Sequence, residues 1–121
     1  MTFDLLALLV LLQVKHFLFD FVWQTPYQLA NKGSWGHPGG ILHSGLHALA
    51  TLVVLLLLGL SPGLILAVAL AEFVVHYHLD WGKEQFVRRF VDGQGAGFWR
   101  AIGFDQMMHQ LTYLAIAYAV A

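Results

Sequence analysis

Histidines and acidic residues recur four residues apart along this chain. The pairs are His16/Asp20, His43/His47, Glu72/His76, His76/Asp80 and Asp105/His109. Side chains four apart share a helix face, with Cβ atoms about 5 to 6 Å apart, so each pair can converge on one object. Imidazole and carboxylate without thiolate suit zinc, manganese, iron or nickel. The chain has no cysteine. The spacing therefore predicts a metal site built on helices.

The segments that carry these pairs are apolar enough to cross a membrane. Of the 121 residues, 59% are hydrophobic and only 11% are charged, whereas about a quarter of a soluble domain is charged. Because about 20 apolar residues cross the hydrocarbon core of a bilayer, we expect four spans, at residues 3–23, 41–60, 62–81 and 104–121. The predicted fold is an all-α, integral-membrane four-helix bundle, with one transmembrane domain over residues 1–121.

The breaks between the predicted spans differ in kind. Residues 25–40 have the proline and glycine content of a loop, and Gly59 to Gly63 form a tight reversal. In residues 83–92, apolar positions alternate with Lys83, Arg88 and Arg89, which predicts a short interfacial helix.

The basic residues predict an orientation. Both long loops carry basic residues, Lys32 in the first and Lys83, Arg88, Arg89 and Arg100 in the second, whereas the short reversal and both chain ends carry none. The positive-inside rule then puts both long loops in the cytoplasm and both termini outside. Because successive helices alternate in direction, all the His/Asp pairs fall in one layer on the cytoplasmic side.

A layer of buried polar groups needs a common partner, because an unpaired charge at membrane depth costs several kcal/mol. We expect one or two divalent ions (zinc, manganese or iron). Glu72, which lies deeper, and Asp105 are candidate catalytic residues, Lys15 is expected to pair with a carboxylate, Gln24 and Gln106 are weaker candidates, and His37 and His78 are expected to be interfacial. The predicted ligands are His16, Asp20, His43, His47, His76, Asp80, Asp105 and His109.

Five short motifs, in order, resemble a family of small bacterial and phage integral-membrane proteins catalogued as domain of unknown function 3307. The resemblance implies this membrane architecture and this polar set, and it assigns no reaction. Glu72 and His78 are additions to the family pattern. The chain also resembles, more distantly, membrane-bound metal-dependent hydrolases. The motifs are "HFLFDFVWQ" (16–24), "NK" (31–32), "HSGLH" (43–47), "HYHLDWGK" (76–83) and "DQMMH" (105–109).

The first functional hypothesis is a metal-dependent hydrolase that acts at the cytoplasmic headgroup level. A bound metal would activate water and polarise a phosphoryl or acyl oxygen. The predicted substrate is a lipid or lipid-linked phosphoester, because the site lies at headgroup depth. Four basic residues either hold an anionic headgroup or only set topology: Lys83, Arg88, Arg89 and Arg100.

Two other hypotheses belong to different classes. The first is a metal-ion or proton carrier, although the parts of the predicted spans in the outer half of the bilayer are apolar and offer no continuous polar path. The second is a b-type haem protein, with two histidines as axial ligands. The lipid bilayer is the expected partner, and nothing in the charge pattern points to nucleic acid. A homodimer is also expected, from the small-residue pairs Ala67/Ala71 and Ala115/Ala119.

Overall fold

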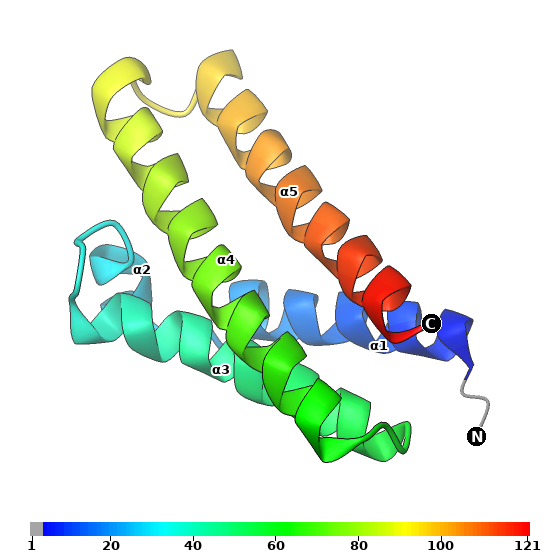
Figure 1. Ribbon diagram of the computed structural model, residues 1–121. Coiled ribbons are helices and arrows are strands. Elements are labelled where there is room, and N and C mark those ends of the chain that lie inside the picture. Colours follow the sequence, from blue (N-terminus) through cyan, green and yellow to red (C-terminus); the bar gives the residue numbers. More distant parts are fainter. Residues whose placement is uncertain (1–3) are drawn as a thin grey trace.

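The computed structural model describes residues 4–121, and every regular element in that range is a helix (Figure 1). This confirms the predicted all-α class. The elements are α1 (Leu5–Phe17), the π-helix η1 (Leu18–Val22), α2 (Pro26–Asn31), α3 (Pro38–Leu57), α4 (Pro62–Phe90) and α5 (Ala96–Val120).

Three segments are long and apolar enough to cross a membrane: Leu5–Val22, Pro38–Leu57 and Pro62–Phe90. The first half of α5 is too polar to qualify, because it carries Arg100, Asp105 and His109. The exposed side of α5 is nevertheless apolar, so a fourth span stays a prediction. Its exposed large side chains recur at helical spacing: Phe104, Met107, Leu111, Leu114 and Tyr118.

The four long helices contact one another in a ring. Helix α1 packs against α3 and α5, and α4 packs against the same two helices. Figure 1 shows α4 and α5 side by side, joined by the short turn that contains Gly93. Helices α1 and α4 are therefore opposite each other, and side chains that meet between them lie in the middle of the molecule.

The interior has an apolar half and a polar half. The apolar half is a cluster of buried side chains from all four long helices, including Leu8, Leu12, Leu55, Ile65 and Ile116. The polar half holds the buried histidines and aspartates, at the opposite end of α1. Between membrane-spanning helices, close van der Waals packing of such side chains drives association, so the apolar half holds the polar half in place.

The predicted boundaries of the last two long helices are corrected by the structure. Helix α4 runs without a break to Phe90, so the separate interfacial helix expected at 83–92 is the end of α4. Helix α5 begins at Ala96 and not at residue 104. Hydropathy marks where a helix becomes polar, but lysine, glutamate, glutamine and arginine are good helix formers. The helices therefore continue past their apolar stretches.

Helix α2 lies in the segment predicted to be a loop. The Thr25 hydroxyl caps it by accepting a hydrogen bond from the Gln28 backbone N–H at 3.3 Å, and Pro26 occupies the first turn. The end of α2 then lies directly against the start of α3. A Cβ atom on Gly39 would lie 2.8 Å from the Cβ of Asn31, so glycine is needed for this approach.

Candidate metal centre

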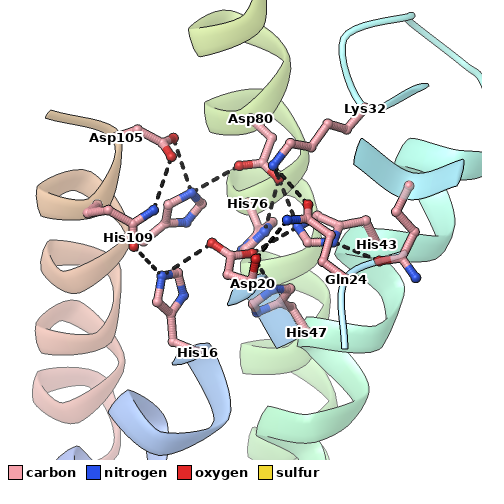
Figure 2. A network of polar contacts seen from close by, with 12 residues as sticks. His16, Asp20, Gln24, Lys32, His43, His47, His76, Asp80, Asp105 and His109 are labelled. Carbon is pink, nitrogen blue, oxygen red and sulfur yellow. Dashed lines mark hydrogen bonds and ion pairs between the residues drawn. The ribbon is translucent and has the colours of Figure 1, made fainter. Parts of the chain in front are cut away.

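Buried histidines and aspartates from η1, α3, α4 and α5 meet in the polar half of the interior (Figure 2). The side chains of His43 and His47 have no exposed surface, and His76, Asp80 and His109 are each 1% exposed. An ionised or strongly polar side chain is rarely buried this deeply without a partner. The cluster therefore needs an internal partner for each of these groups.

One group of possible metal ligands contains Asp20, His43, His47 and His76, whose ligand atoms all lie within 4.8 Å of one another. The Oδ1 atom of Asp20 is 2.8 Å from Nε2 of His47 and 3.0 Å from Nε2 of His43. A tetrahedral zinc ion with ligands at 2.0 to 2.2 Å would separate its ligand atoms by about 3.3 to 3.6 Å. The contact between Asp20 and His47 is also a hydrogen bond, and both observed distances are a few tenths of an ångström shorter than the separation around such an ion.

A second group contains His76, Asp80 and His109, again within 4.8 Å. One carboxylate oxygen of Asp80 is 3.1 Å from Nε2 of His109, and the other is 3.2 Å from Nε2 of His76. The same oxygen, Oδ2, is also 3.1 Å from Nε2 of His43. Since His76 belongs to both groups and Asp80 reaches His43, the two groups form one continuous cluster.

Several atoms in the cluster are close together but are not aligned for hydrogen bonding. Within residues 4–121, Nε2 of His43, Nε2 of His76 and Oδ2 of Asp80 are buried without a hydrogen-bond partner. Each lies 3.0 to 3.2 Å from an atom of the cluster. Buried polar atoms normally have a partner. Atoms that crowd together in this way can serve as ligands of a shared cation.

A glutamine of α2 fixes the orientation of one imidazole. Oε1 of Gln28 lies 2.9 Å from Nδ1 of His43, so that Nδ1 donates and, in the neutral ring, the lone pair of Nε2 faces Asp20 and Asp80. Two carboxylate oxygens and a nitrogen lone pair repel one another. Contacts of this kind, which orient the far side of a ligand imidazole, are usual around protein-bound metals.

The π-helix positions Asp20. The helix is α-helical to Phe17, and the wider π turn of Leu18–Val22 then carries Asp20 into the interior while Phe21 and Val22 stay exposed. Single π turns occur often at functional sites. A side chain also stabilises the backbone of the turn, because the amide of Gln24 donates a hydrogen bond to the Asp20 backbone carbonyl at 2.7 Å.

Two of the predicted ligands lie at the edge of the cluster. His16 is 3.3 Å from Asp20, but its ring nitrogens also contact the Tyr113 hydroxyl at 2.8 Å and the Gln106 side chain at 2.7 Å. Asp105 is 3.3 Å from Nε2 of His109. Neither residue belongs to the two groups, so His16 and Asp105 contact the ligand set from outside.

Glu72 faces a lysine, not the cluster. Its Oε1 forms a close ion pair with Nζ of Lys15, which also donates to the His47 carbonyl at 3.2 Å. The expected pairing of Lys15 with a carboxylate is confirmed, and it joins the two helices that lie opposite each other. A catalytic role for Glu72 or Asp105 stays a prediction.

The other predicted polar residues lie outside the two groups. His78 is exposed and its ring contacts the Val74 carbonyl, while His37 caps the start of α3 by accepting from the Gly39 backbone N–H. Gln24 contacts the Asp20 carbonyl, and Gln106 contacts His16.

Sequence reasoning missed two residues that surround the cluster, since Gln28 orients His43 and Tyr113 contacts His16. Lys32, part of the "NK" motif, was given no role there, and its ammonium group lies 3.9 Å from Oδ2 of Asp80. A signal for Gln28 was present, because threonine followed three residues later by glutamine is a helix-start pattern. No sequence pattern near Tyr113 indicated that it lies beside the cluster.

Comparison with known proteins identifies the family. The model described as "Protein of unknown function (DUF3307)" matches residues 8–121. The chain belongs to this family. The match spans every residue of both groups, which confirms the resemblance seen in the five motifs. No curated protein and no solved structure matches the chain significantly. The cluster can hold a divalent cation, and its chemistry has to be argued from the residues themselves.

Proposed function

We propose that the protein is an integral membrane protein that binds a divalent cation in the His/Asp cluster. We propose further that it hydrolyses a lipid or lipid-linked phosphoester at the cytoplasmic headgroup level. The observation that carries the metal site is the set of buried, unpartnered atoms on His43, His76 and Asp80, which crowd around one another. A cation would turn each of these repulsive contacts into a shared ligand contact.

The charge of the cluster supports a divalent ion. The carboxylates of Asp20, Asp80 and Asp105 carry three negative charges, and Lys32 is the lysine that approaches them from α2, at 3.9 Å from Asp80. With neutral histidines the excess is two negative charges, which one divalent cation balances. A second ion would have to share His76, because that residue belongs to both groups.

The residues around the cation suit hydrolysis. When bound, a divalent ion lowers the pKa of water and polarises a phosphoryl oxygen. Asp105 is then the best-placed candidate to accept a proton, because its Oδ1 is buried, has no hydrogen-bond partner in residues 4–121, and lies next to His109. Glu72 is a weaker candidate for this role, since Lys15 already neutralises it.

The two alternative hypotheses fit the structure less well. A carrier needs a polar path, whereas the other half of the interior is filled by packed apolar side chains such as Leu8, Leu12 and Leu55. Haem needs a slot between two imidazoles that is wide enough for the macrocycle. Neighbouring rings here are as close as 4.0 Å between the centroids of His47 and His76.

A paired variant tests the proposal. Wild-type protein purified in detergent should contain or take up about one zinc, manganese or iron ion per chain and should release phosphate from phosphatidic acid in mixed micelles. His76→Ala should lose both the metal and the hydrolysis, because His76 belongs to both groups. His78→Ala, two residues away, exposed and outside both groups, should retain the metal. A wild type that neither carries nor takes up metal, or that hydrolyses equally well without it, would contradict the proposal.

A further inference from the structure

A cleft lies between the end of α4 and the start of α5, on the side of α5 where Asp105 contacts the cluster. Its volume is about 590 Å³, within the range of about 300 to 1,000 Å³ that is typical of small-molecule sites. Most of the lining is apolar. The larger side chains are Leu79, Phe86, Phe90, Phe104 and Met108.

Two basic side chains also line this cleft, Lys83 and Arg100. Arg100 is exposed and makes no hydrogen bond or ion pair with another residue of the described range 4–121. Lys83 contacts Glu84 at 2.6 Å, which uses one of its three donors. An apolar cleft with two cationic groups fits a ligand that has an apolar chain and an anionic head.

Asp105 connects this cleft to the candidate metal centre. It lines the cleft and its Oδ1 lies 3.3 Å from Nε2 of His109. A head group held by Lys83 and Arg100 would thus lie on the cleft side of the His/Asp cluster. No other residue of the cluster lines the cleft, so Asp105 is the point of access.

We infer that this cleft binds a membrane phospholipid, with its acyl chain between α4 and α5 and its phosphate against Lys83 and Arg100. The inference rests on the proposed function for its choice of a phosphate head group, and it names the site through which that substrate would reach the cation. The exposed aromatic residues Phe86 and Phe90, which are 52% and 72% exposed, would be covered by the acyl chain. The structure thereby gives a role to apolar residues that sequence reasoning assigned to the headgroup layer.

Two glycines allow the cleft to be filled without disturbing the helices. Gly82 and Gly97 both line it, and a Cβ atom on either would have no atom within 4 Å. Gly103, also within α5, is equally open but does not line the cleft. Leucine favours a helix more than glycine does, so Gly82→Leu and Gly97→Leu should fold, with Gly103→Leu as the matched control.

The experiment is a titration followed by native mass spectrometry of the full chain in detergent. Dioleoyl phosphatidic acid should bind at least about tenfold more tightly than dioleoyl phosphatidylcholine, since charge-assisted hydrogen bonds are the stronger ones. Gly82→Leu and Gly97→Leu should weaken binding of phosphatidic acid by about tenfold or more. Gly103→Leu should not change it. Arg100→Gln should remove most of the preference for phosphatidic acid.

Equal binding of the two lipids, or wild-type binding by both leucine variants in the cleft, would overturn the inference. Competition by inorganic phosphate at the same concentration would also overturn it, because the site would then recognise free phosphate and not a lipid. If lipid binding follows this pattern but no hydrolysis occurs with any metal, the proposed hydrolysis fails and the lipid site stands.

Discussion

Removal of the cation should destabilise the whole helix assembly, because the ligand atoms are buried. The atoms that lack a partner at the centre of the cluster are Nε2 of His43, Nε2 of His76 and Oδ2 of Asp80. An unsatisfied buried polar atom costs about 1 to 3 kcal/mol. Three such atoms give a penalty of at least about 3 kcal/mol, which a bound cation would relieve. By mass action, a stabilisation of about 2.7 kcal/mol needs free metal at about one hundred times its Kd.

The assay is thermal unfolding in detergent, followed by the fluorescence of the four tryptophans. Wild-type protein with excess metal should unfold on the order of 10 °C above the same protein in a chelator. His76→Ala should show no metal-dependent shift, and His78→Ala should show the full shift. For each variant, only the difference between its unfolding temperatures in metal and in chelator is compared, because His76→Ala also leaves a cavity that lowers stability by itself.

The pH dependence of the shift separates a cation from protonated histidines. Metal binding requires neutral imidazoles, so the shift should be larger at about pH 8 than at about pH 6. If the cluster were held by imidazolium–carboxylate pairs alone, the chelator would have no effect and acidification would stabilise the protein. That result, or a full metal response in His76→Ala, would refute the reasoning.

Three further predictions concern the contacts around the cluster. Glu72→Met and Lys15→Met should each lower the free energy of unfolding by about 3 to 5 kcal/mol, because each leaves a buried charge alone. The double variant should lose far less free energy of unfolding than the sum of the two single losses. Additive losses in denaturant titrations would disprove the pairing. Gln28→Ala should weaken metal affinity by about 10- to 100-fold in competition with a chelating dye, since the imidazole of His43 loses its orientation; unchanged affinity would contradict that role. Gly39→Val should also weaken metal binding in the dye assay, because it pushes α2 away from α3, whereas Gly63→Val, with open space around it, should not.

The sequence was sufficient to predict which histidines and aspartates lie close together, because the relevant signal is local. Residues four apart on a helix share a face whatever lies opposite them. Of the five pairs, His16/Asp20, His76/Asp80 and Asp105/His109 are each within 3.3 Å, and the rings of His43 and His47 are 4.8 Å apart. Glu72/His76 shares a helix face, but Glu72 pairs with Lys15 across the interior.

Contacts between helices could not be read from spacing. Nothing in the chain near Tyr113 indicates that its hydroxyl meets His16, because that contact depends on how α1 packs against α5. The ends of α4 and α5 were misjudged for a different reason. Hydropathy falls after Trp81 and rises again only near Phe104, yet the backbone stays helical to Phe90 and resumes at Ala96. Gly82 costs a helix only about 1 kcal/mol relative to alanine, which does not end it.

The π turn at Leu18–Val22 has a consequence for how the first segment can vary. A π turn holds more residues than an α turn, so residues up to Phe17 and the residues of the turn itself, Leu18–Val22, follow two different angular frames. The apolar packing of Leu8 and Leu12 belongs to the first frame, and the carboxylate of Asp20 belongs to the second. Deletion of one residue within the turn would restore a single frame and rotate Asp20 by about 100°, away from the three histidines that it faces. The first segment can therefore exchange its exposed apolar residues, such as Leu6 and Val10, whereas the length of this one turn is constrained.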